Sequence, residues 1–468
     1  MSNIGHAAAR MTASKAIDVI LKNMDKDREK EVVKLVDLMQ KYMSEEKLDL
    51  NYDKARAMIC DKNGTLNHYM NRILDEVDPY VLKTMALNLG FESFLYGTKT
   101  IRKMREKYHC NIPWLILMDP TSACNLHCTG CWAAEYGNKL NLTFAEIDHV
   151  VEQGKKLGVY FYMFTGGEPL VRKADLIRLC EKHNDCAFLS FTNGTLVDEA
   201  FCAELKRVGN LYLAISLEGF SEVNDLRRGS GVFGKVMHAM DLLKENGLVF
   251  GTSVCYTSKN CETVTSDEFV DLMIEKGCRY AMYFHYMPVG NDASLELLPT
   301  PEQRMYIKDR IREIRKLENG EGLFTMDFQN DGEFVGGCIA GGRNYFHINA
   351  NGDAEPCVFI HYSGANIRTH SLLEILKQPL FMAYHNNQPF NENHLRPCPM
   401  LENPEILQRL VKETGAKSTD LQSPETVEHL CTKCEEYARN WKPCADKLWS
   451  ETEVAPKSYE NYKKQNIL

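Results

Sequence analysis

From residue 112 to about residue 290, short apolar segments alternate with helical patterns, and this alternation constrains the fold more than any other feature. The apolar segments, rich in aromatic and β-branched residues, are 114–118, 159–164, 187–191, 211–216, 249–256 and 280–286. Helical patterns between them include 144–156, 198–208, 232–245 and 267–276. Such strand–helix units predict a parallel sheet with helical crossovers, either an open doubly wound sheet or a full or partial barrel. In these folds the chemistry lies at the carboxyl ends of the strands.

Regions of different character flank this alternation. Residues 1–111 carry apolar residues at helical spacing among many charges, which predicts an N-terminal helical region. Past residue 300 the alternation stops, and a charged helix over 301–317 leads into a Gly-, Asn- and Cys-rich region. We therefore expect three parts, with the α/β domain at 112–300 and a cysteine-rich C-terminal domain at 301–468.

The charge balance and the hydropathy limit the possible partners. With 55 Lys and Arg against 64 Asp and Glu, the formal charge is −9, which argues against general nucleic-acid binding. No apolar run approaches the roughly 18 residues of a membrane span. The first 15 residues lack the apolar core of a signal peptide, and Ser2 stands where myristoylation requires Gly. We therefore expect a cytoplasmic protein.

One segment keeps a membrane contact open as a hypothesis. Residues 91–108 combine aromatic residues with Lys99, Arg102, Lys103 and further basic residues. A basic helix with aromatic side chains is suited to a membrane surface or an anionic lipid headgroup. The alternative is a solvated helix packed on the main domain.

The chain has 17 cysteines, a number that is informative in a protein without an export signal. The cytosol keeps thiols reduced, so metal or cluster ligation, catalysis and simple burial are the remaining roles. Eight scattered cysteines are interpreted as core or surface thiols: Cys60, Cys110, Cys180, Cys186, Cys202, Cys255, Cys261 and Cys278. The others fall into a tight group after the first strand and a looser group beyond residue 337.

The tight group is Cys124, Cys128 and Cys131, on the loop after the first predicted strand. Three thiolates on one loop can hold three irons of a [4Fe–4S] cube, because thiolate is the soft ligand that such iron prefers. No fourth cysteine is near in sequence, so one iron is left for an exogenous ligand. A zinc site completed by His127 is the alternative, but adjacent residues rarely point into one tetrahedral site.

The second predicted strand ends in Gly166, Gly167 and Glu168. Two glycines allow a ligand or the backbone to approach closely. The Glu168 carboxylate stands where it can bind an ammonium group. Because the ends of neighbouring parallel strands lie together, this turn is expected beside the cysteine loop.

Together the cysteine loop and the Gly-Gly-Glu-Pro turn resemble the radical S-adenosylmethionine (SAM) superfamily, over residues 112 to about 290. The resemblance implies a partial (β/α)6 barrel of the TIM type. It also implies a [4Fe–4S] cluster whose open iron binds S-adenosylmethionine, which one-electron reduction cleaves to a 5′-deoxyadenosyl radical that abstracts hydrogen from substrate. The residues that the resemblance places at S-adenosylmethionine are Gly166, Gly167, Glu168, Asn193, Ser216, Glu218 and Arg228. It assigns no further catalytic residue. Glu218 replaces the Asp of the family's ribose-contacting motif.

The looser cysteine group resembles the SPASM/twitch extension, which carries auxiliary [4Fe–4S] clusters in its relatives. The spacing that carries the resemblance is Cys338, Gly352 and Cys357, with Cys398, Cys431, Cys434 and Cys444 following. We expect at least one auxiliary cluster, held by Cys338, Cys357, Cys398 and either Cys431 or Cys434. A structural zinc site from the same residues is the alternative.

The sequence says less about the substrate than about the cofactors. Gly130 precedes the third cysteine and Trp132 follows it, a variant that resembles tetraether lipid synthases and adenosyl-hopene enzymes. The first hypothesis is therefore a lipid tail and C–C bond formation. The second is a SPASM-type peptide or protein maturase, and the third a non-catalytic iron–sulfur or zinc protein. A low-potential electron donor such as flavodoxin or ferredoxin is expected as partner. Tyr283, His285 and Tyr286 either line the substrate cavity or belong to the core.

Overall fold

The computed structural model describes residues 3–42, 51–316, 320 and 322–452. The outer ends of the first and last expected parts, residues 1–2 and 453–468, lie outside this range. Residue 317, with which the expected charged helix ends, also lies outside it.

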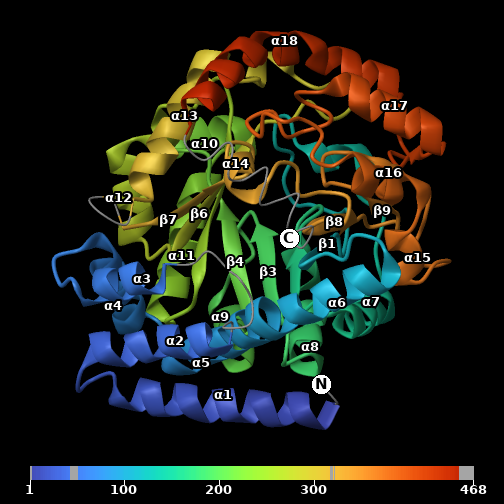
Figure 1. The fold of residues 1–468 in the computed structure, drawn as a ribbon. Helices are drawn as coiled ribbons and strands as arrows, with labels where there is room; N and C mark the ends of the chain where they lie inside the picture. Colours follow the sequence, from blue (N-terminus) through green and yellow to red (C-terminus); the bar gives the residue numbers. More distant parts are fainter. Residues whose placement is uncertain (1–2, 43–50, 317–319, 321, 453–468) are drawn as a thin grey trace.

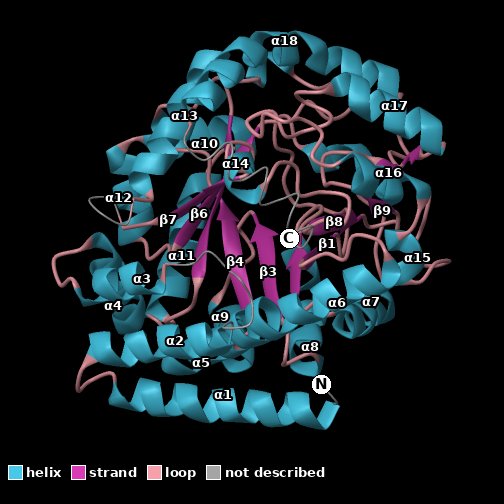
Figure 2. Cartoon of the chain, in the orientation of Figure 1, coloured by secondary structure: helices cyan, strands magenta, loops and turns pink. Residues whose placement is uncertain are grey.

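A single large sheet forms the centre of the protein, in the order β7-β6-β5-β4-β3-β2-β1-β8-β9 (Figures 1 and 2). All neighbouring strands in it are parallel except the β8–β9 pair. Its strands are β1 (Leu115–Met118), β2 (Phe161–Phe164), β3 (Ala187–Thr192), β4 (Leu211–Ser216), β5 (Phe250–Tyr256), β6 (Tyr280–His285), β7 (Phe324–Asp327), β8 (Tyr345–Ile348) and β9 (Ala354–Glu355). The predicted α/β fold with a parallel sheet is confirmed.

Helices follow the strands as the sequence pattern predicts. They are α7 (Phe144–Leu157), α8 (Lys173–Lys182), α9 (Glu199–Val208), α10 (Ser221–Arg228), α11 (Val232–Glu245), α12 (Asp267–Glu275) and α13 (Pro301–Ile314), with the 3₁₀ turns η2 (Trp132–Tyr136), η3 (Pro169–Arg172), η4 (Thr263–Thr265) and η5 (Leu295–Leu297). The first begins with a capping box, in which Thr143 and Glu146 satisfy each other's backbone N–H groups, and it ends at Gly158 in the left-handed conformation. Local signals therefore fix these helix ends.

The sheet continues past residue 300, where the alternation was expected to stop. Strand β7 pairs with β6, and β8 pairs with β1 at the other edge of the barrel. That expectation was wrong because β7, with the sequence Phe-Thr-Met-Asp, is short and mixed in polarity. The domain boundary at residue 300 stays a prediction.

The N-terminal region is helical, as predicted, and lies below the amino ends of the strands in Figure 1. It comprises α1 (Asn3–Asn23), α2 (Arg28–Tyr42), α3 (Tyr52–Cys60), α4 (Thr65–Glu76), α5 (Pro79–Met85), the π-helix η1 (Ala86–Gly97) and α6 (Thr98–Tyr108). Glu92 of η1 is fully buried and binds His6 at 2.7 Å and Arg10 at 2.9 Å. This ion pair fastens α1 to η1, which in turn contacts β2 and β3.

The aromatic side chains of segment 91–108 pack mainly against the protein itself. Phe91 is buried, and Tyr96 stacks on His6 with ring centroids 3.7 Å apart. The Lys99 ammonium lies 4.3 Å from the centre of the Tyr42 ring. This is the arrangement expected of a helix packed on the main domain. Across the described ranges, no helix has the length and apolar character needed to cross a bilayer.

The C-terminal elements arch over the carboxyl ends of the strands, with α17 and α18 uppermost in Figure 1. They are α14 (Gly332–Val335), β10 (Tyr362–Ser363), α15 (Leu372–Leu376), α16 (Pro379–Asn387), α17 (Pro404–Thr414), β11 (Lys417–Ser418) and α18 (Val427–Glu451). Gly352 forms the β8–β9 turn with φ +87°, and a Cβ there would lie 2.9 Å from Asn366 Oδ1. This turn therefore requires the glycine of the predicted cysteine–glycine pattern.

A buried ion pair joins the barrel to the C-terminal arch. Arg304 of α13 and Glu402 are both fully buried, with Nη1 and Oε1 2.7 Å apart. The guanidinium also donates to the Tyr437 hydroxyl of α18 and lies 4.2 Å from the centre of the Trp441 ring. Tyr437 in turn contacts His285 Nε2 at 2.7 Å, so β6, α13 and α18 meet at this pair.

We predict that Arg304→Met lowers the free energy of unfolding by about 3 to 5 kcal/mol, because it leaves the Glu402 carboxylate buried without its counter-charge. Urea denaturation followed by circular dichroism measures the change. The double variant Arg304→Met/Glu402→Leu should recover most of the loss, since no unpaired charge remains. A double variant no more stable than Arg304→Met would contradict this account.

Candidate functional site

The cysteine loop leaves the carboxyl end of β1 and holds three half-buried thiols. Burial raises the pKa of the Cys124 thiol to about 11, although the thiol accepts a hydrogen bond from the Leu126 N–H at 3.4 Å. The guanidinium of Arg228 lies 3.9 Å from the Cys128 sulfur. Cys131 is also half-buried. The predicted loop therefore presents its thiols beside positive charge at the carboxyl edge of the sheet.

The Gly166-Gly167-Glu168 turn lies directly against this loop. Gly167 N–H donates to Thr121 O at 3.0 Å, and Glu168 N–H donates to Ala123 O at 2.8 Å. A Cβ on Gly167 would be 2.2 Å from Ala123 O. The sequence left open whether a ligand or the backbone approaches these glycines. The structure shows the backbone of the cysteine loop against Gly167.

Glu168 is buried at the junction of three strand ends. Its carboxylate accepts hydrogen bonds from Leu170 N–H at 2.9 Å, Thr192 Oγ1 at 2.7 Å and Asn193 N–H at 2.7 Å. Burial raises the pKa of this carboxyl, and these donors oppose the rise. The geometry gives Glu168 a clear role in joining the ends of β2 and β3.

Two further predicted residues lie on the neighbouring strands. Asn193 donates to Asn125 Oδ1 at 2.8 Å, which ties the end of β3 to the cysteine loop. Ser216 is half-buried at the end of β4. Both therefore lie at the carboxyl edge, where the sequence placed them.

Glu218 and two arginines form the charged part of the site. Glu218 is fully buried, and its Oε1 binds Arg227 Nη1 at 2.7 Å and Arg228 Nε at 3.1 Å. Its Oε2 is buried and has no hydrogen-bond partner. Such an atom is costly unless a ligand supplies a donor, so this carboxylate fits a site for a polar ligand. The sequence singled out Arg228 but missed Arg227, the adjacent residue on α10.

The donor set fits an iron–sulfur cube better than a single ion. Within the described ranges, no group of three or more Cys, His, Asp or Glu residues is arranged to hold one metal ion. A cube accepts thiolates that are spread over three corners, whereas one zinc ion needs its ligands around a single centre. The three thiols beside an arginine and an unpartnered carboxylate oxygen therefore fit a cluster with a polar co-ligand.

The auxiliary cysteines gather around two buried tyrosines. Tyr345 of β8 contacts the Cys357 sulfur through its hydroxyl at 2.8 Å. The Tyr384 hydroxyl of α16 is buried without a hydrogen-bond partner. Burial raises the pKa of Tyr384, and the nearby thiols that raise it further are Cys338, Cys357, Cys398 and Cys431. These four thiols thus lie near one hydroxyl donor that has no hydrogen-bond partner, which fits a cluster with sulfur acceptors.

Cys434 and Cys444 lie further along α18. Cys434 is fully buried one turn after Cys431, and Cys444 is half-buried next to Pro443, which lies inside the helix. Cys431 is among the thiols that raise the pKa of Tyr384, so it lies near the other three members of the group. The choice between Cys431 and Cys434 as the fourth member stays a prediction.

A buried charge network that the sequence did not predict lies beside the cysteine loop. His347 of β8 contacts Asp119 at 2.8 Å and Glu355 at 2.7 Å, and all three are fully buried. Tyr136 donates to both Glu355 oxygens, at 2.9 and 2.7 Å. Asp119 directly follows β1, so this network links the root of the cysteine loop to the β8–β9 hairpin. The feature by which the sequence could have indicated this network is Asp119, an acidic residue directly after a buried strand.

Near the carboxyl ends of the strands, several side chains on the inner face of the barrel are partly exposed. The half-buried side chains that share this face toward the carboxyl ends are Met163, Phe191, Ser216, Ser253, Cys255 and Phe284. Phe191 and Phe284 come from non-neighbouring strands and meet with centroids 5.8 Å apart. Cys255 was interpreted as a scattered thiol, but its position on β5 aims it inward, near Arg227 and Glu218. The sequence could have indicated this direction, because alternate residues of a strand share a face and Cys255 is two and four residues from Ser253 and Gly251.

Other residues considered in the sequence are structural. Tyr283 donates to Val264 O at 2.8 Å on the helix side of the sheet. Burial and Arg304 lower the pKa of His285 to about 3, so it is a neutral core residue.

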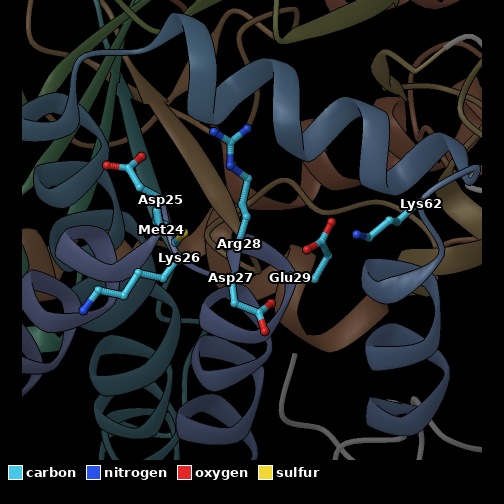
Figure 3. A pocket seen from close by; sticks show the side chains of 7 residues that line it. All are labelled: Met24, Asp25, Lys26, Asp27, Arg28, Glu29 and Lys62. Atoms are coloured by element: carbon cyan, nitrogen blue, oxygen red, sulfur yellow. The ribbon is translucent and has the colours of Figure 1, made fainter.

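Two surface pockets lie away from these residues. Figure 3 shows the first, at the α1–α2 turn, with a volume of about 430 Å³ and a lining of Met24, Asp25, Lys26, Asp27, Arg28, Glu29 and Lys62. Arg28 is paired with Asp75 at 2.8 Å. The second, of about 480 Å³, lies between α7 and residues 367–372. Neither contains a residue of the cysteine loop.

We predict that Gly167→Ala displaces the cysteine loop, because the added Cβ meets Ala123 O, and lowers the free energy of unfolding by about 1 to 3 kcal/mol. Iron content after anaerobic reconstitution and urea denaturation measure both effects. Gly234→Ala is the matched control, since a Cβ at this exposed helical position meets nothing within 4 Å. Equal iron content and stability in the two variants would contradict the prediction.

We predict that stability falls at high pH through His347. Burial alone would lower its pKa, but Asp119 and Glu355 outweigh burial and raise the pKa to about 10. The unfolded pKa is about 6.5. The stabilising contribution is therefore complete below about pH 6.5 and is lost as the pH rises through about 10. Urea midpoints across this range should fall for the wild type and much less for His347→Gln; parallel curves would refute the assignment.

Comparison with known proteins agrees with this geometry. The chain matches the radical SAM superfamily over residues 118–279 and an iron–sulfur cluster-binding SPASM domain over residues 338–400. It is 26% identical to Fe-coproporphyrin III synthase of Methanosarcina barkeri, over 61% of this chain and 79% of that protein. It is 28% identical to PqqA peptide cyclase of Granulibacter bethesdensis, over 52% of this chain and 67% of that protein.

Among solved structures, Streptococcus suis SuiB shares the fold. SuiB bound to S-adenosylmethionine superposes with a TM-score of 0.54 at 19% identity, over 71% of this chain and 80% of SuiB. SuiB bound to its precursor peptide SuiA gives a TM-score of 0.50 at 19% identity, over 64% and 70% of the two chains. The resemblance to tetraether lipid synthases found no support in these comparisons. The chain is therefore an enzyme of the radical SAM superfamily with a C-terminal SPASM domain, and its cofactors are [4Fe–4S] clusters and S-adenosylmethionine.

Proposed function

We propose that this enzyme abstracts a hydrogen atom from a peptide or protein side chain. The observation that carries the proposal is the arrangement at the strand ends, where the cysteine loop and the Glu218–arginine group lie next to a half-open, apolar inner face. When bound, the reduced cluster supplies the electron that cleaves S-adenosylmethionine. The names of the PqqA peptide cyclase and of the SuiB–SuiA complex support a peptide as substrate.

The chain's own residues have distinct tasks in this proposal. Cys124, Cys128 and Cys131 hold the first cluster and leave one iron for S-adenosylmethionine. Arg228 faces the Cys128 sulfur and the ligand's carboxylate, and Glu218 offers its unpartnered Oε2 to ligand hydroxyl groups. The remaining contacts to the cofactor are proposed for Gly166, Gly167, Glu168, Asn193 and Ser216.

Besides its proposed contact to the cofactor, Glu168 has a supporting role in the fold. Its oxygens already accept hydrogen bonds from three groups of the chain. It holds the ends of β2 and β3 in register, so that the backbone of the Gly166-Gly167 turn faces the cofactor.

The second cluster site is proposed on Cys338, Cys357, Cys398 and Cys431, with Cys434 as the alternative fourth ligand. Tyr384 donates its otherwise unsatisfied hydroxyl to sulfur there. This site lies above the barrel and shields the reacting groups from water.

A tetrapyrrole is the second candidate substrate, favoured by the similarity to Fe-coproporphyrin III synthase across 79% of that protein. The lipid hypothesis is not retained, because the resemblance to tetraether lipid synthases found no support in the comparisons, and Phe91 and Tyr96 of the basic aromatic segment pack within the protein. A flavodoxin or ferredoxin remains the proposed electron donor.

Anaerobically reconstituted enzyme with S-adenosylmethionine and dithionite should release 5′-deoxyadenosine, and Cys124→Ala should abolish the release because the first cluster is lost. Cys431→Ala should lower the iron content by about one cluster and leave the first cluster spectroscopically intact. Cys444→Ala is the matched control on the same helix. Product release by Cys124→Ala equal to wild type would contradict the site.

The substrate class is tested by isotope transfer. A tryptic digest of a uniformly deuterated protein and deuterated iron coproporphyrin III serve as the two probes. Mass spectrometry then detects deuterium in 5′-deoxyadenosine. Transfer from the peptide pool supports the proposal, whereas transfer from the porphyrin alone supports the second candidate.

A further inference from the structure

Trp132 occupies the boundary between the two thiol sites. It follows Cys131 directly in the chain and is therefore covalently attached to the first site. Its ring packs on the C-terminal domain, edge-on to Phe359 with centroids 6.2 Å apart. It also packs edge-on to His347 at 5.8 Å and His361 at 6.1 Å.

From Phe359 the aromatic contact continues to the second site. Phe359 is two residues after Cys357 in the chain. Its ring also lies 6.4 Å from Phe328, which in turn lies 5.9 Å from Tyr345. The Tyr345 hydroxyl contacts the Cys357 sulfur at 2.8 Å. Two routes thus run from Cys131 to Cys357, a short one through Trp132 and Phe359 and a longer one through rings alone.

We propose that Trp132 couples the two cluster sites electronically, so that an electron passes between them through the Trp132–Phe359 contact. Packed π systems offer a lower tunnelling barrier than saturated side chains or a gap of the same length. Cys338, Cys357, Cys398 and Cys431 would hold the reduced cluster that gives up one electron, and Cys124, Cys128 and Cys131 would hold the cluster that accepts it. No bond to Trp132 forms or breaks, and no proton moves.

This role is separate from the choice of substrate, although it rests on the thiol assignment proposed above. Simple anchoring of the cysteine loop is the competing explanation, because Trp132 also packs edge-on to Tyr136 at 6.2 Å, and a ring that contacts four others stabilises packing. The two explanations differ in what they change. If Trp132 is only an anchor, its removal alters the environment of a cluster. If Trp132 couples the sites, its removal alters only the rate at which an electron passes between the clusters.

The test uses the full chain with both clusters and without substrate. Deazaflavin photoreduction delivers less than one electron per protein, and freeze-quench EPR follows its redistribution between the two cluster signals. Cys124→Ala and Cys338→Ala provide the reference spectrum of each single cluster. The variants are Trp132→Leu, which removes the ring, and Trp132→Phe, which keeps an aromatic ring. Trp114→Leu is the matched control, since Trp114 packs on Phe161 at 5.3 Å, at the start of β1.

We expect Trp132→Leu to lose the fast phase of redistribution with the reduction potential and EPR spectrum of each cluster unchanged. Trp132→Phe should retain part of that phase, and Trp114→Leu should retain all of it. The proposal is overturned if Trp132→Leu redistributes the electron as fast as wild type, or if slowing comes with a shifted potential in either cluster. Should Trp132→Leu fail to assemble both clusters, Phe359→Leu replaces it with the same two outcomes, because it removes the next ring and leaves the cysteine loop unaltered.

Discussion

The close approach of two backbones at the carboxyl edge of the sheet is the constraint on which the site depends. Thr121 and Ala123 on the cysteine loop accept hydrogen bonds from Gly167 and Glu168 after β2. Any side chain at Gly167 would collide with the Ala123 carbonyl. The loop therefore gains a rigid support on one side, and its thiols are presented at fixed positions rather than on a mobile tip.

Buried charge organises the surroundings of this loop. The protein buries Glu92, Glu218, Glu355 and Glu402, and each is placed beside at least one basic group. Burial of an ion is tolerated only when a partner compensates the lost hydration. Two of these pairs, Glu92–Arg10 and Glu402–Arg304, also join segments far apart in the chain, so they specify which elements meet. The pair at Glu218 differs, because its Oε2 has neither a hydrogen bond nor an ion pair, whereas Oε1 binds both arginines, and a polar ligand is expected at this place.

The C-terminal domain is continuous with the barrel rather than appended to it. Strand β8 pairs directly with β1, and His347 on β8 contacts Asp119 at the root of the cysteine loop. Trp132 extends from the same loop onto Phe359. Movement of one thiol site relative to the other would break these buried contacts. The two sites therefore act as parts of one rigid framework.

Sequence alone determined the local order of the protein and the chemistry of its thiols. The six strands and four of the six helices between them, α7, α9, α11 and α12, were predicted nearly residue by residue, because hydrophobic periodicity and capping residues act within short segments. The cysteine spacing likewise predicted a cluster loop at a strand end. Contacts between distant segments were decided only by the tertiary structure: the pairing of β8 with β1, and the His347–Asp119 and Trp132–Phe359 contacts. Such contacts depend on how elements pack across hundreds of residues of chain, and neither spacing nor composition records that packing.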